Sequence, residues 1–130
     1  MNPNADRTTA PTIGCAALLG LVEQAGLAVV TLVEGLAREE LLRSRLTRVE
    51  VLRQLRTLAD SAARLPDSVR TQMPEADWAG WETLRPTLHG PAGPALDDTL
   101  WFASTSLAPA LLLWLRVYRQ SHAEWFRMAA

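Results

Sequence analysis

The chain has 130 residues, of which 48% are hydrophobic, and this suits one compact domain that buries a core without metals or disulfides. All 13 basic residues are arginines, and 14 acidic residues bring the net charge to −1. A chain so close to neutral lacks the broad basic surface that grips nucleic acid, so any such contact has to be local.

Cysteine and histidine are scarce. Cys15 is the only cysteine, which excludes a disulfide scaffold and makes a reducing cytoplasm the expected compartment. Two histidines, no cysteine pair and no carboxylates at ligand spacing give no support for metal binding. We therefore expect no metal and no other cofactor.

Composition also sets the expected ends of the domain. Residues 1–13 have no basic region that leads into an apolar core, so they predict a flexible N-terminal tail instead of a signal peptide, and residues 14–130 form the domain. The uncharged segment from Leu100 to Leu115 has 16 residues, which is short for a membrane span. We expect a buried helix there and no membrane contact.

Two long helices are predicted in the first half of the chain. Apolar residues recur at helical spacing from Cys15 to Leu36. A second series repeats at steps of three and four residues from Val51 to Leu65, and Pro66 should end it because proline cannot continue a helix.

Short elements follow the second long helix. Asp67 and Asp77 are candidate caps of two short helices, and the second of these should begin at Trp78. The run G-P-A-G-P at residues 90–94 predicts a loop, because no ordinary helix crosses it.

One more long helix is expected after the loop. Asp97 or Asp98 should open it, it should run toward Tyr118, and Pro109 should kink it. No strand-like alternation of apolar and polar residues occurs. The predicted fold class is therefore all-α, with four main helices, or five if the short ones are counted.

A series of motifs lies between Leu52 and Pro109. A helix ends in R-L-P, and it is followed by P-E-A-D-W, by L-R-P-T-L-H and by a helix led by Trp101. This order resembles the HepT-like proteins of the HEPN superfamily, small helical ribonucleases and toxins, whose pattern is R-L-P, P-E-x-x-W and R-N-x-x-x-H-x-Y. The resemblance extends from about Leu18 to Arg119. It implies a HEPN-type helical bundle that forms a homodimer.

The active-site motif of the family is only partly present. Counted without gaps from Trp78, the family's arginine falls on Arg85, seven residues later. Its histidine position then falls on Gly90 and its tyrosine position on Ala92, while His89 lies one residue early. The scaffold matches the family better than the motif does.

The resemblance implies a metal-independent endoribonuclease with Arg85 and His89 as its catalytic residues. In the family the histidine moves a proton during attack by the 2′-hydroxyl of RNA, and the arginine neutralises charge that develops on the phosphate. These residue types suit the roles, because histidine titrates near neutral pH and arginine stays charged. Two such motifs meet across the dimer in this family.

Other roles for the two residues remain open. On a continuous helix Arg85 and His89 would lie one turn apart, but Pro86 disfavours helical geometry at Arg85. Arg85 could instead pair with Glu82 or Asp77 on the surface. His89 could be a solvated residue before a Gly-Pro turn.

Two residues of the second long helix are expected to support the site or to bind RNA. Asp60 stands where the family usually has an acid, and Arg53 precedes it by seven residues. As an alternative, Asp60 could form a salt bridge with Arg56 or Arg64 on its own helix.

The resemblance also implies a partner. An MntA-like nucleotidyltransferase antitoxin silences the toxins of this family by adding AMP to the motif tyrosine, but this chain has Ala92 there and Tyr118 as its only tyrosine. Control by binding is therefore expected. The leading hypothesis is a HepT-like toxin of a bacterial toxin–antitoxin pair that binds RNA. The alternative is a catalytically inactive HEPN module that acts as a partner-binding or adaptor protein.

Overall fold

The computed structural model describes residues 13–127, and this part of the chain is helical with no strands, as the hydrophobic spacing predicts. The α-helices are α2 (Ile13–Val33), α3 (Arg38–Arg43), α4 (Arg45–Ala63), α5 (Asp67–Thr71), α6 (Trp78–Leu88), α7 (Pro94–Phe102) and α8 (Ala108–Ser121). Single turns form η1 (Pro74–Ala76), η2 (Ala103–Leu107) and η3 (Ala123–Phe126). Because α7, η2 and α8 are continuous, the described residues form six helices, more than the predicted four or five.

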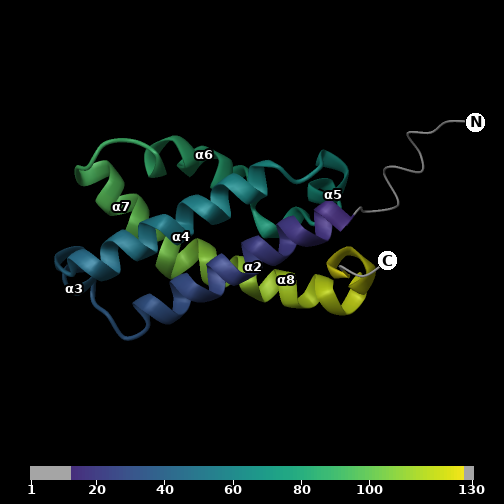
Figure 1. Cartoon of the computed structure of the whole chain (residues 1–130), viewed down its shortest axis with the longest axis horizontal. Coiled ribbons are helices and arrows are strands. Elements are labelled where there is room, and N and C mark those ends of the chain that lie inside the picture. The colour runs from purple at the N-terminus through teal and green to yellow at the C-terminus, as the bar shows by residue number, and fades with distance from the viewer. Residues whose placement is uncertain (1–12, 128–130) are drawn as a thin grey trace, which may run out of the picture.

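Helix α4 is central to the packing. It lies against α2 along one side and against α6 along the other, while α8 packs on α2 and α7 packs on α6 (Figure 1). The helices enclose one core, which includes Leu19, Val22, Leu55, Leu58, Trp81, Leu88, Leu111 and Leu115. The contact between α4 and α6 carries the residues that the sequence singles out as a site.

Helix α6 begins at Trp78 under an Asp77 cap, as predicted. The carboxylate of Asp77 accepts a hydrogen bond from the backbone N–H of Gly80 at 3.1 Å. Asp77 adopts a left-handed backbone conformation with φ of 54°, which aspartate tolerates better than most residues. This cap fixes the register of α6 and thereby the side on which Arg85 and His89 lie.

The prediction that Asp67 caps a short helix is wrong by one residue. Asp67 is the first helical residue of α5, and Pro66 occupies the cap position in an extended conformation. The carboxylate of Asp67 pairs with Arg70 one turn later, where an acid in the first turn also favours the helix dipole.

The last long helix starts at Pro94, earlier than the predicted Asp97 or Asp98. Proline is favoured at the first position of a helix, because its missing N–H would have no partner there. The two aspartates lie inside the helix instead. Asp97 pairs with Arg48 and Asp98 with Arg38, so they tie the start of α7 to α4 and α3.

The helix passes Pro109 by means of a wider turn, where the sequence predicts a kink. The N–H of Ala108 donates to the carbonyl of Ala103, five residues back, so the η2 segment is a π turn directly before the proline. The extra residue in this turn accommodates the ring and the missing donor of Pro109. The buried hydroxyl of Ser104 donates to the carbonyl of Leu100 at 2.6 Å.

The structure bears only slightly on the predicted N-terminal tail and on the expected absence of membrane contact. Of the tail predicted for residues 1–13, only Ile13 lies within the described residues, as the first residue of α2. Two helices, Gly14–Val33 and Pro94–Ser121, are long and apolar enough to cross a membrane by length and composition. This is weak evidence, since core helices of water-soluble proteins pass the same test.

Candidate functional site

Arg85, His89 and Asp60 meet at the contact between α4 and α6. The Nε of Arg85 donates to Oδ1 of Asp60 at 2.8 Å. The Nε2 of His89 lies 2.8 Å from the same oxygen and 3.1 Å from Oδ2. A carboxylate at neutral pH only accepts hydrogen bonds, so Nε2 of His89 carries the proton in this contact. One carboxylate therefore orients both candidate catalytic side chains.

Arg85 and His89 lie one turn apart because α6 continues through Pro86. His89 caps the helix, and its N–H donates to the carbonyl of Arg85 at 3.2 Å. The expected break at Arg85 is therefore wrong. Pro86 removes the donor to the carbonyl of Glu82, but Glu82 is exposed, so water can take that place. The helix tolerates the proline within its last turn.

The end of α6 is also tied to α4 by Arg56. Its Nε donates to the carbonyl of Leu88 at 2.6 Å, and Leu88 itself is fully buried. This bond satisfies one of the carbonyls that a helix C-terminus leaves without a partner. Arg56 is thus not the partner of Asp60 that its position on α4 allowed, and the buried Leu88 holds the neighbouring His89 at the surface of the α4–α6 contact.

The electrostatics of the cluster favour an ionised Asp60. Partial burial of Asp60 opposes ionisation, but hydrogen bonds from Arg85 and His89, together with their charges, outweigh it. They hold the pKa of the Asp60 carboxyl below its ordinary value.

A cavity of about 390 Å³ opens beside the cluster, and Glu82, Arg85, Pro86 and His89 line it. Within residues 13–127, the terminal nitrogens of the Arg85 guanidinium, Nδ1 of His89 and the Glu82 carboxylate have no hydrogen-bond partner. The cavity therefore presents a fixed cation, an imidazole nitrogen and a carboxylate to solvent. Such a set can bind a phosphate and move protons.

Arg53 is not part of this arrangement. It lies on α4 and bonds to Glu50 through two nitrogens, at 3.0 Å and 2.5 Å. The hydrogen bonds of Arg53 and Gln54 lower the pKa of Glu50 to about 2. The structure thus places Asp60 in contact with Arg85 and His89 and leaves Arg53 in a surface pair outside the cavity.

Glu82 is the residue that the sequence reasoning missed. The sequence suggests Glu82 only as a surface partner of Arg85. In the structure Arg85 bonds to Asp60 instead, and Glu82 lines the same cavity without a partner in the described part of the chain. The signal was present in the spacing, because Glu82, Arg85 and His89 follow each other at steps of three and four residues on one helix.

The only tyrosine of the chain is too buried to be modified in the way that the motif tyrosine of the HepT-like family is. Tyr118 is buried on α8, with 8% of its surface exposed, and its hydroxyl donates to the carboxylate of Glu75. Ala92 at the motif position is exposed in the loop before α7. No exposed tyrosine therefore exists for an enzyme to modify.

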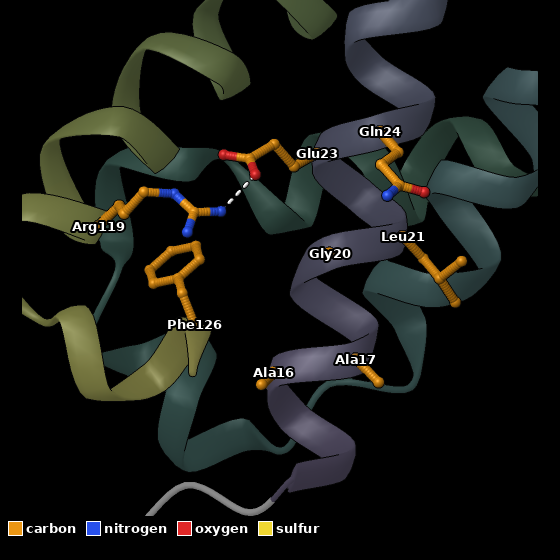
Figure 2. Close-up of a pocket in the computed structure, with 8 residues that line it drawn as sticks. All are labelled: Ala16, Ala17, Gly20, Leu21, Glu23, Gln24, Arg119 and Phe126. Atoms are coloured by element: carbon orange, nitrogen blue, oxygen red, sulfur yellow. Dashed lines mark hydrogen bonds and ion pairs between the residues drawn. The ribbon is translucent and has the colours of Figure 1, made fainter. Parts of the chain in front are cut away.

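A larger cavity of about 490 Å³ lies between α2 and the C-terminal turn η3 (Figure 2). Its α2 side consists of the small or apolar residues Ala16, Ala17, Gly20 and Leu21 and of the polar residues Glu23 and Gln24. Opposite them the Arg119 guanidinium lies over the Phe126 ring at 4.6 Å and pairs with Glu23. Because the two charged groups satisfy each other, this cavity offers no free acid–base set, and the smaller cavity is the better candidate for chemistry.

No protein-family model, no curated protein and no solved structure matches the chain. Among the described residues no group of three or more His, Cys, Asp or Glu could hold a metal ion. The Asp60 cluster and the cavity beside it are the features of the described residues that indicate a function.

Proposed function

We propose that the protein is a metal-independent endoribonuclease, the HepT-like toxin of a toxin–antitoxin pair with a HEPN-type bundle. One observation carries the proposal. Asp60 holds Arg85 and His89 together at the mouth of a single cavity, although the histidine lies one residue from the position that the family motif prescribes.

The geometry suits phosphate chemistry on RNA. Arg85 keeps its terminal nitrogens free, so a phosphate can accept two hydrogen bonds from them while Nε remains on Asp60. His89 keeps Nδ1 free for proton transfer while Nε2 remains on the same carboxylate. Attack by the 2′-hydroxyl on the neighbouring phosphate then needs no metal, because arginine stabilises the charge that develops on the phosphate oxygens.

The proposed partners are a second copy of the chain, an MntA-like nucleotidyltransferase and RNA, in the cytoplasm. Since Ala92 and the buried Tyr118 leave no tyrosine to modify, we propose that the antitoxin acts by binding. The guanidinium of Arg85, rather than the overall charge of −1, would attract the phosphates of the RNA.

Cleavage of a defined RNA in the presence of EDTA tests the proposal. We expect wild type to cleave, and Arg85→Ala and His89→Ala to lower the rate by about 10²- to 10⁴-fold, the usual contribution of a proton-transfer group. Arg116→Ala is the matched control, because Arg116 is exposed on α8 and has no partner in the described residues. If the Arg85→Ala variant cleaved RNA at the wild-type rate, the catalytic role proposed for Arg85 would be refuted.

The second candidate is the adaptor, a HEPN module without chemistry. The observation that favours it is the outer face of α2, where Leu21, Gln24, Leu27 and Thr31 are exposed and uncharged. Absence of cleavage by the wild type, together with loss of self-association in Leu27→Glu by analytical ultracentrifugation, would favour this reading.

A further inference from the structure

Cleavage of RNA by its own 2′-hydroxyl requires two proton transfers on opposite sides of the phosphorus. One group removes the proton from the 2′-oxygen, and another protonates the 5′-oxygen as it leaves, because the attacking and leaving oxygens lie roughly in line. A single imidazole cannot serve both oxygens in the same step. The site therefore needs a second acid–base residue besides His89.

Glu82 occupies the position that such a residue requires. It precedes Arg85 by three residues and His89 by seven, so the three share one face of α6, and Glu82 and His89 are separated by about 10 Å of helix rise. Arg85 lies between them. All three line the same cavity, so a phosphate on Arg85 would have the carboxylate on one side and the imidazole on the other.

Glu82 is also free to act. It is exposed and makes no hydrogen bond or ion pair within the described residues, whereas Glu50 is held by Arg53 and Glu75 by Tyr118. A carboxylate without a partner beside an arginine and a histidine has no evident structural role. Glu34 is exposed without a partner as well, so it is the position of Glu82 in the same cavity as Arg85 and His89 that points to contact with a ligand.

We infer that Glu82 is the general base of the cleavage and His89 the general acid, an inference that rests on the proposed ribonuclease function. The Glu82 carboxylate takes the 2′-hydroxyl proton while the 2′-oxygen forms a bond to phosphorus. The bond from phosphorus to the 5′-oxygen breaks, and Nδ1–H of the His89 imidazolium gives that oxygen its proton. The products are a 2′,3′-cyclic phosphate and a 5′-hydroxyl, and water returns both residues to their starting protonation.

Asp60 fits this division of labour. Its carboxylate accepts a hydrogen bond from Nε2–H of His89 and thereby holds the imidazole ring in one orientation beside the cavity. It also leaves the second N–H, at Nδ1, for the substrate. The acid, the base and the cation then come from one protomer, so a dimer partner need not contribute a side chain to proton transfer.

The pH–rate profile of Glu82→Gln tests the inference. A base that must be ionised and an acid that must be protonated give a bell-shaped dependence of kcat/KM on pH in the wild type. We expect Glu82→Gln to lose about 10²- to 10⁴-fold in rate and to lose the acid-side limb. Glu34→Gln, which changes an exposed glutamate in the turn after α2, should keep both the wild-type rate and the bell-shaped pH dependence.

A substrate with sulfur in place of the 5′-oxygen separates the two roles, because a thiolate leaves without a proton. We expect this substrate to restore most of the rate of His89→Ala and little of the rate of Glu82→Gln. Restoration of Glu82→Gln but not of His89→Ala would overturn the assignment of base and acid.

These experiments distinguish a failure of the role assigned to Glu82 from a failure of the proposed ribonuclease function. If the wild type cleaves RNA and depends on Arg85 and His89, but Glu82→Gln keeps the wild-type rate and profile, the role of Glu82 is refuted and the ribonuclease stands. If the wild type cleaves neither substrate, the ribonuclease and the role of Glu82 fall together. Circular dichroism of each variant checks that the protein is folded before its cleavage rate is compared with that of the wild type.

Discussion

At the residue scale, Asp60 organises the candidate site by serving two partners with one carboxylate. Arg85 and His89 both contact it, and all three side chains are about two-fifths exposed. Exposed ion pairs contribute little to stability, about 0–1 kcal/mol, because solvent screens them. The cluster therefore orients the side chains of Arg85 and His89 much more than it stabilises the fold.

The pH dependence of stability should report Asp60 directly. The folded-state pKa of its carboxyl lies below the unfolded value of about 3.9, so its stabilising contribution is present above that pH and is lost as the pH falls through the folded pKa. We expect Asp60→Asn to lower the free energy of unfolding by up to about 1 kcal/mol at pH 5, and the difference to shrink toward pH 3. Urea unfolding at both pH values measures it.

A difference between wild type and Asp60→Asn that stays constant from about pH 5 to pH 3 would contradict the lowered pKa of Asp60. Glu34→Gln serves as the control, because Glu34 is exposed and forms no ion pair in the described part of the chain.

At the scale of the element, α6 brings the site together by its periodicity. Its start is set by the Asp77 cap and its end by the bond from Arg56 to the Leu88 carbonyl. Between these points the helix places Glu82 and Arg85 on one face. Pro86 interrupts the hydrogen-bond ladder without ending the helix.

Replacement of Pro86 should therefore stabilise α6. Pro86→Ala returns an N–H that can donate to the Glu82 carbonyl and replaces a residue that is unfavourable in a helix interior. We expect the free energy of unfolding to rise by about 1–3 kcal/mol in a denaturant titration.

Pro91→Ala is the control for this prediction, because Pro91 is exposed in the loop before α7. It should lower stability slightly, by about 0.4–1 kcal/mol, since alanine gives the unfolded chain more freedom. A loss of stability in Pro86→Ala would mean that α6 gains nothing from the restored donor.

At the scale of the whole molecule, α4 separates two surfaces. The candidate site lies where α4 meets α6, whereas α2, whose exposed residues include Leu21 and Leu27, packs along the other side of α4 (Figure 1). α2 and α6 have no substantial contact with each other. A partner that covers the outer face of α2 would therefore leave the cavity at Glu82, Arg85 and His89 open to RNA.

The core around α4 should dominate the stability of the molecule. Leu55 is fully buried on α4, and Leu55→Ala should lower the free energy of unfolding by about 2–5 kcal/mol through lost contacts and a residual cavity. Leu46, on the same helix, is 85% exposed, and Leu46→Ala should change stability by no more than about 0.5 kcal/mol. Chemical denaturation of both variants measures the contrast, and equal losses would refute the described packing of α4.

The sequence predicted well what depends on local spacing and capping. The all-helical class, the end of α4 before Pro66 and the start of α6 at Trp78 follow from apolar periodicity and from residues that cap or stop helices. Predictions that treated proline only as a breaker were less accurate. A helix can start at Pro94, pass Pro86 and widen before Pro109, because its neighbours and solvent compensate for the missing donors.

Residue type and spacing are local properties, so the sequence alone was enough to single out Arg85 and His89 as candidates for acid–base and phosphate chemistry. It left open whether Asp60 pairs with Arg56, Arg64 or the site. Only the tertiary structure decided that, by joining Asp60 to Arg85 and His89, which follow it by 25 and 29 residues. Such a partnership depends on how α4 packs against α6, and this packing is set by the whole buried core rather than by any short stretch of the chain.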